Sequence, residues 1–190
     1  MTSDITEKAL RYIRALFDGN AGGHDYGHTV RVLKNALQIA ETEPGADREI
    51  ITLAALLHDA DDHKLFQTEN NANARSFLAE NGIPEDRIER IVSVINCVSF
   101  SRNRGRTPDT VEGKIVQDAD RLDAMGAIGI ARTFAYGGEH GRPIEESVQH
   151  FYDKLLHLKD MMNTEAGRRL AAERHTVLEK FLAEYKKETA

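Results

Sequence analysis

The chain has 190 residues, of which 41% are hydrophobic and 29% are charged, a composition typical of soluble globular proteins. Its formal net charge of −6 argues against a general nucleic-acid binder, which is usually basic. A phosphorylated small molecule stays compatible with that charge, because a metal and a few local cations can set the field of a pocket. The single cysteine excludes an internal disulfide, and no stretch approaches the roughly 18 apolar residues that cross a bilayer. We expect one cytoplasmic domain over residues 1–190, without a membrane or nucleic-acid polymer as partner.

Apolar residues recur at three- and four-residue steps along most of the chain, which predicts helices. The first six predicted helices cover residues 5–17, 30–40, 50–57, 72–78, 84–98 and 110–123. The third is apolar around most of its surface, so we expect it at the centre of the fold. Residues 99–109 contain turn formers, three arginines and no apolar period, which indicates a loop.

The second half continues in the same way. Residues 124–131 predict a helix of small residues, where Gly126 and Gly129 indicate close approach by a neighbouring helix. Residues 136–143 predict a second loop, and two helices within 144–187 follow, the last one starting after an Asn163-Thr164 cap. No segment alternates with period two, so the sequence predicts an all-α, single-domain helical bundle. Its metal-site core covers about residues 20–135, with the helices of 144–187 packing on that core.

A histidine and an aspartate stand side by side at the end of the apolar run 50–57, as His58 and Asp59. Imidazole nitrogen and carboxylate oxygen are both ligands for Mn, Fe, Co, Ni or Zn. Such an ionisable pair at the end of a buried helix is costly unless something compensates it, and a divalent metal would compensate both groups. The alternative is structural: His58 as a hydrogen-bonded helix-end residue and Asp59 as a cap.

Two further stretches can complete a metal site. Residues 23–32 contain His24 and His28, and residues 116–124 contain Asp118, Asp120 and Asp123. One histidine from the first, the His58-Asp59 pair and one aspartate from the second would come from three predicted helices. Such a set of N and O ligands leaves positions open for water and substrate.

This order of ligands, H…HD…D, resembles that of the HD-domain metal-dependent phosphohydrolases. The resemblance covers nearly the whole chain and is closest to the small, single-domain bacterial HD hydrolases. It rests on the stretches 54–59 (AALLHD), 114–124 (KIVQDADRLDA), 131–138 (ARTFAYGG), 150–156 (HFYDKLL) and 159–164 (KDMMNT).

The resemblance implies that the metal ligands are His28, His58, Asp59 and Asp120. The family places its first histidine just ahead of an Arg-Val pair, which favours His28 over His24, and its last aspartate in an Ala-Asp-x-x-Asp-Ala run, which favours Asp120 over Asp118. Asp123 would then support Asp120 from the same helix face, and His24 or Asp25 would orient a ligand imidazole through its other nitrogen. Two histidines and two carboxylates favour Mn²⁺, with Fe²⁺, Co²⁺ and Ni²⁺ as alternatives and Mg²⁺ less well suited.

The resemblance also suggests catalytic residues beside the metal. In related HD nucleotidases an acidic residue three positions after the HD aspartate resembles a general acid or base, which points to Asp62. The alternative is a solvated carboxylate at the helix end. Lys64 would meet a phosphate as a point charge, or lie on the surface.

A polyphosphate substrate also needs cations away from the metal. The candidates are Arg102 with its neighbours Arg104 and Arg106 in the predicted loop, and Arg121, which is otherwise a structural partner of the adjacent aspartates. The resemblance adds His150 and Lys154, one turn apart on a late helix, as residues that close the pocket.

These residues together predict a metal-dependent phosphohydrolase that acts on a nucleotide. Within this branch of the family the resemblance favours hydrolysis of (deoxy)nucleoside triphosphates with release of pyrophosphate. A 5′-nucleotidase acting on monophosphates is the alternative enzyme, and a non-catalytic sensor of metal and nucleotide is the alternative outside enzymes. The sequence is compatible with a monomer or a homodimer.

Overall fold

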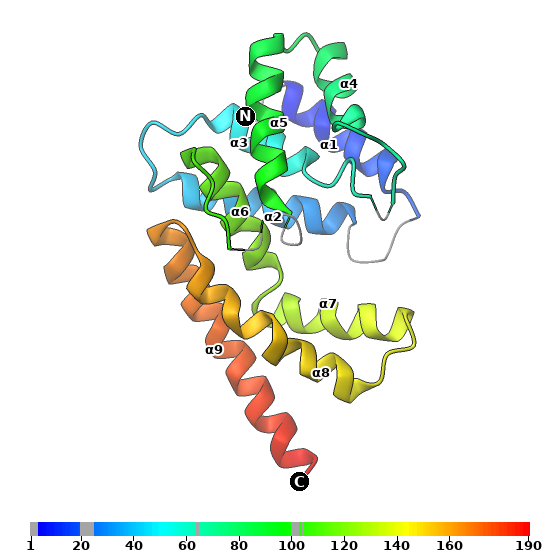
Figure 1. Cartoon of the computed structure of the whole chain (residues 1–190), viewed down its shortest axis with the longest axis vertical. Coiled ribbons are helices and arrows are strands. Elements are labelled where there is room, and N and C mark those ends of the chain that lie inside the picture. Colours follow the sequence, from blue (N-terminus) through cyan, green and yellow to red (C-terminus); the bar gives the residue numbers. More distant parts are fainter. Residues whose placement is uncertain (1–3, 20–24, 64, 100–102, 104) are drawn as a thin grey trace.

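The computed structural model describes residues 4–19, 25–63, 65–99, 103 and 105–190. These residues form nine α-helices and one 3-10 helix, without a β-strand among them (Figure 1), so the predicted all-α fold is confirmed. The helices are α1 (Asp4–Leu16), α2 (Tyr26–Ala40), α3 (Arg48–Leu57), α4 (Ala72–Glu80), α5 (Glu85–Val98), α6 (Val111–Asp123), α7 (Gly126–Glu139), α8 (Ile144–Asp153), η1 (Leu155–Met161) and α9 (Glu165–Glu188). Within the described ranges, no helix has both the length and the apolar character needed to cross a membrane.

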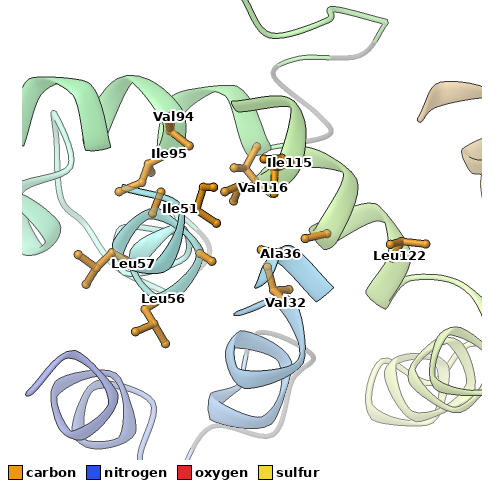
Figure 2. Close-up of a cluster of buried hydrophobic side chains, with 14 of the residues drawn as sticks. Val32, Ala36, Ile51, Leu56, Leu57, Val94, Ile95, Ile115, Val116 and Leu122 are labelled. Atoms are coloured by element: carbon orange, nitrogen blue, oxygen red, sulfur yellow. The ribbon is translucent and has the colours of Figure 1, made fainter. Parts of the chain in front are cut away.

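The apolar helix α3 lies at the centre of the upper group of helices, as its sequence predicts. It contacts α1, α2, α5 and α6, and its residues from Leu53 to Leu57 are fully buried. Figure 2 shows Ile51 of α3 between Ile95 of α5 and Val116 of α6. This packing holds the C-terminal end of α3, and therefore His58, against α2 and α6.

Side-chain caps fix where the two helices that carry the first and last metal-site residues begin. The Asp25 carboxylate accepts a hydrogen bond of 2.6 Å from the His28 amide, so α2 starts at Tyr26 and His28 lies in its first turn. Thr110 caps α6 by accepting from the Gly113 amide. Asp25 therefore acts as a helix cap, which corrects the expectation that it orients a ligand imidazole.

Helix α7 extends to Glu139, and this corrects the prediction of a loop beginning at residue 136. The Tyr136-Gly137-Gly138 run suggests a turn, but Gly137 serves helix packing instead. A Cβ atom at Gly137 would lie 2.4 Å from the Ser147 hydroxyl of α8. The absence of a side chain thus lets α7 and α8 lie side by side in the lower part of the molecule (Figure 1).

Two further glycines of α7, Gly126 and Gly129, are required for different reasons. Gly126 has a φ of +65° and a Cβ there would lie 3.2 Å from the Arg174 side chain of α9, so both the backbone conformation and a neighbouring helix require glycine. A Cβ at Gly129 would lie 2.3 Å from the Ala124 carbonyl oxygen. At Gly129 the close neighbour is therefore the preceding turn of the same chain, not the neighbouring helix that we expected.

Asp118 joins α6 to the beginning of α9. Its fully buried carboxylate accepts hydrogen bonds from the amides of Asn163 and Thr164 and from the Thr164 hydroxyl, at 2.8 to 3.1 Å. Thr164 in turn caps α9 by accepting from the Gly167 amide, as predicted. Asp118 is thus committed to holding the C-terminal helix.

Candidate metal centre

Two imidazoles and two carboxylates meet where α2, the end of α3 and α6 converge. His28 Nε2 lies 3.2 Å from His58 Nε2, 3.3 Å from an Asp59 oxygen and 3.4 Å from an Asp120 oxygen. His58 Nε2 lies 3.2 Å from Asp59 and 3.9 Å from Asp120. The structure therefore brings together the four residues for which the sequence predicts metal binding.

The other ring nitrogen of each histidine is bonded elsewhere. His28 Nδ1 lies 2.7 Å from Asp123 Oδ2, and His58 Nδ1 lies 2.9 Å from the Ala55 carbonyl. Because both of these partners accept, each neutral imidazole carries its hydrogen on Nδ1 and directs a lone pair from Nε2 into the site. Four acceptors then face one another, an arrangement that requires a cation between them.

The pKa values of the two histidines also indicate that this site favours a positive charge. Burial lowers the pKa of His58, but the nearby carboxylates of Asp59 and Asp120 outweigh it and raise this pKa to about 9. Burial likewise lowers the pKa of His28, and its hydrogen bonds to Asp123 and Asp59 raise it above the usual value. The carboxylates thus favour positive charge at this point, and a divalent ion would supply it.

The spacing of the donor atoms suits one metal ion. Ligands bound at about 2.1 Å to one ion are separated by about 3.0 Å when adjacent and about 4.2 Å when opposite in an octahedron. The donor atoms of His28, His58 and Asp120 all lie within 4.8 Å of one another. The separations of 3.2 Å between the two histidine nitrogens and 3.9 Å between His58 and Asp120 lie between the octahedral values for adjacent and opposite ligands. The C-terminal end of α3, where His58 is the C-cap, adds the negative end of a helix dipole.

Asp123 supports His28 from behind, and two arginines hold Asp123. Arg31 donates from Nε and Nη2 to its two oxygens at 2.7 and 3.0 Å, and Arg132 donates from Nη1 at 2.6 Å. Burial raises the pKa of Asp123, but its hydrogen bonds to His28 and Arg31 hold that pKa well below the usual range. Asp123 therefore stays ionised and orients the His28 ring.

Arg31 and Arg132 have no role predicted from the sequence. The available signal for Arg31 was its position one turn after His28 on an amphipathic helix. Arg132 offered only a charge among small and apolar residues. Because Asp123 lies 92 and 9 positions away from them in sequence, only the fold shows that all three meet.

The metal site opens on the side of Asp120. The side chains of His28 and His58 are 2% and 3% exposed, whereas that of Asp120 is 24% exposed. A substrate can therefore reach the site past Asp120, while the histidines are enclosed by protein. The arrangement combines a buried ligand set with one accessible face, as a metal-assisted hydrolysis requires.

The two aspartates that follow Asp59 and Ala60, Asp61 and Asp62, have different surroundings. Asp61 accepts hydrogen bonds from the Asn73 and Ala74 amides at 2.9 and 3.0 Å, and so caps α4 from a distance in sequence. Asp62 lies in the turn that follows α3, where its amide donates to the Asp59 carbonyl. Asp61 is thus a structural carboxylate, which leaves Asp62 as the candidate acid or base of this run.

The remaining predicted site residues, which include the substrate-binding candidates, Lys64 and His24, fall into three groups. Arg121 is buried and donates to the Met161 carbonyl, so it joins η1 to α6 and does not face a substrate. His24, Lys64, Arg102 and Arg104 lie outside the described residues. His150 and Lys154 lie together at the end of α8, where burial and the positive charges of Lys154 and Arg142 lower the pKa of His150.

Comparison of the sequence and the fold with known proteins identifies the family of this chain. Residues 25–125 match the HD domain family model, and the chain belongs to that family. It is an HD-type metal-dependent phosphohydrolase, with divalent metal as its cofactor class.

The relatives extend over the full chain. The protein YpgQ of Bacillus subtilis (strain 168) is 39% identical, with 96% of this chain and 92% of YpgQ covered. The crystal structure of YpgQ in complex with ADP has a TM-score of 0.84 at 36% identity and covers 96% of this chain and 97% of that one. An HD-superfamily hydrolase from Bacillus thuringiensis is 42% identical, with a TM-score of 0.78 and 96% and 95% coverage.

Proposed function

We propose that this phosphohydrolase acts on nucleotides and hydrolyses (deoxy)nucleoside triphosphates to a monophosphate and pyrophosphate. The observation that supports a nucleotide substrate is the crystal structure of YpgQ in complex with ADP. YpgQ has a similar fold at 36% identity, and the match covers 97% of its chain. The open face beside Asp120 and the positive charges of Lys154 and Arg142 near His150 support a substrate that carries several phosphates.

The proposed ligands are His28, His58, Asp59 and Asp120, with Mn²⁺ as the preferred ion because the set combines imidazole nitrogen with carboxylate oxygen. When bound, the ion would supply an activated water and neutralise charge on phosphorus. The Asp123 carboxylate keeps the His28 ring in one orientation, and the Ala55 carbonyl does the same for His58.

Asp62 is the proposed acid or base. The oxygen of water forms a bond to the α-phosphorus while the bond from that phosphorus to the bridging oxygen breaks, and pyrophosphate leaves with the electron pair. Asp62 would take the proton from water or return it to the leaving group. Its place in the first turn after Asp59 keeps it close to the metal-site residues.

The test is turnover by protein loaded with Mn²⁺ against nucleoside mono-, di- and triphosphates, with phosphate and pyrophosphate measured separately. We expect pyrophosphate from triphosphates, none with Asp59→Ala, and a rate reduced about 10²- to 10⁴-fold with Asp62→Asn. Asp62→Asn should still bind Mn²⁺, which separates a proton-transfer role from a ligand role.

Two results would contradict the proposal in different ways. Phosphate released from monophosphates alone would assign the enzyme as a 5′-nucleotidase. Metal and nucleotide binding without any turnover would assign it as a sensor.

A further inference from the structure

A second pocket lies behind the metal site, between α2, the turn that joins α6 to α7, and α9. Its volume is about 450 Å³, within the range of small-molecule sites. None of the four proposed metal ligands lines it, although Asp123 and Arg31 do. We refer to it as the α2–α7–α9 pocket.

Three cationic side chains line this pocket. Arg31 and Lys34 come from α2, and Arg174 comes from α9. Arg174 is half-buried, and its two Nη atoms donate to neutral acceptors, the Leu122 carbonyl and the Asn35 side chain. Its charge is therefore not neutralised by a hydrogen-bonded carboxylate.

Two carboxylates, Asp123 and Glu173, also line the pocket and interact electrostatically with Arg174, so they offset part of its positive charge. Asp123 is already bonded by Arg31 and by Arg132, which lies outside the lining. Glu173 is exposed on α9. Lys34 is exposed and forms no ion pair with any described residue, so its charge remains available to a ligand.

The beginning of α7 adds hydrogen-bond donors to the same wall. The first amides of a helix have no acceptor inside that helix, and the N-cap residue Met125 offers no side-chain acceptor. In the described part of the chain, the amides of Gly126, Ala127 and Ile128 have no acceptor. Free amides and cations around one cavity form the usual surroundings of a bound phosphate group.

The apolar residues that line the pocket indicate which organic group the phosphate carries. Ala127, Ile128 and Val177 form an exposed aliphatic wall, with Ile128 42% and Val177 40% exposed. No aromatic side chain is among the lining residues, so nothing there would stack on a nucleobase. The pocket thus suits a phosphate on a short, non-aromatic organic group.

We propose that the α2–α7–α9 pocket is a second binding site, which takes a small phosphate monoester such as a sugar phosphate. The phosphate would lie at the first amides of α7, between Lys34 and Arg174, and the organic part would contact Ile128 and Val177. The proposal does not depend on the proposed reaction, because none of the four proposed metal ligands lines this pocket.

The test is a titration with ribose 5-phosphate, followed by the amide resonances of Ala127 and Ile128, with ribose as the control that lacks phosphate. We expect both amides to shift with ribose 5-phosphate and not with ribose. Lys34→Glu and Ala127→Glu should each weaken binding at least about tenfold, because each places a carboxylate at the phosphate position.

Ala127→Glu adds an acidic residue to the first turn of α7, which favours the helix, so lost binding cannot be attributed to a lost fold. Lys180→Glu makes the same change in net charge as Lys34→Glu, but on an exposed part of α9 outside the pocket, and it should leave binding unchanged.

Asp59→Ala separates this site from the metal centre. Persistence of the shifts in that variant supports the second pocket, and their loss would place the ligand at the metal centre and overturn the proposal. Absence of any shift up to about 10 mM ligand, or equal binding by Lys34→Glu and the native protein, would overturn it as well.

Discussion

At the scale of single residues, the role of each buried aspartate follows from the groups to which it is hydrogen-bonded. Asp118 and Asp123 lie on one helix and are equally buried, yet Asp118 accepts from the start of α9 whereas Asp123 accepts from His28 and two arginines. Burial alone would not separate a structural carboxylate from one that serves the metal centre.

This difference makes Asp118 and Asp123 a matched pair for mutation. Asp123→Asn removes the charge that holds Arg31 and Arg132 and that fixes the His28 ring, so we expect Mn²⁺ affinity to fall about 10- to 100-fold. Asp118→Asn should lower the free energy of unfolding by about 1 to 3 kcal/mol and leave Mn²⁺ affinity unchanged. Calorimetric Mn²⁺ titrations and urea unfolding of both variants measure the two effects, and an equal loss of affinity in both would contradict the roles assigned.

The pH dependence of metal binding follows from His58. Its pKa of about 9 in the metal-free site means that below this pH a metal must displace a proton. Mn²⁺ affinity should therefore rise with pH, roughly tenfold for each unit and each proton displaced, and level off near pH 9. Titration in two buffers of different ionisation enthalpy counts the protons released. An affinity independent of pH between about 6 and 8 would show that the metal displaces no proton from His58.

At the scale of helices, glycine and cap positions determine how the site is assembled. Caps at Asp25 and Thr110 set the start of α2 and α6, and therefore the faces on which His28 and Asp120 point. The glycines of α7 then allow this helix to turn back sharply after α6 and to lie against α8, which carries Arg132 to Asp123.

We expect substitution by alanine to change the unfolding free energy in opposite directions at two glycines of α7. Gly129→Ala would place a Cβ 2.3 Å from the Ala124 carbonyl, where only backbone movement can relieve the contact, so we expect a loss of about 1 to 3 kcal/mol in unfolding free energy. A Cβ at Gly138 meets nothing within 4 Å, so Gly138→Ala should be stabilising by up to about 1 kcal/mol. Chemical unfolding of both variants tests this, and an equal effect at the two positions would refute the packing argument.

At the scale of the whole molecule, the buried hydrophobic cluster contains residues from α1 to α9, from Ala9 to Leu182. The metal centre draws on three of these helices, and Asp118 and Arg121 join the C-terminal helices to α6. We therefore propose that the chain unfolds as one cooperative unit over residues 1–190 and that metal binding stabilises all of it.

Thermal unfolding with and without Mn²⁺ tests this proposal. An ion present at 100 times its dissociation constant adds about 2.7 kcal/mol to the folded state, which for a chain of this size raises Tm by about 5 to 10 °C. Asp59→Ala should abolish the increase. Two separate transitions, or the same increase in Asp59→Ala, would contradict a single unit stabilised at the HD site.

The sequence by itself determined the all-α class, the central position of α3 and the four residues proposed as metal ligands. The class and the position of α3 follow from helical apolar spacing, and the His58-Asp59 pair follows from its place at the end of a buried run. The choice of His28 and Asp120 follows from the resemblance to HD hydrolases. The tertiary structure decided which aspartate has which partners, that Arg121 is buried, that α7 continues through Gly137 and Gly138, and that Arg31 and Arg132 converge on Asp123. Those outcomes depend on contacts between residues far apart in the chain, where a side chain's role is set by the neighbour that the fold supplies and not by the residues beside it in sequence.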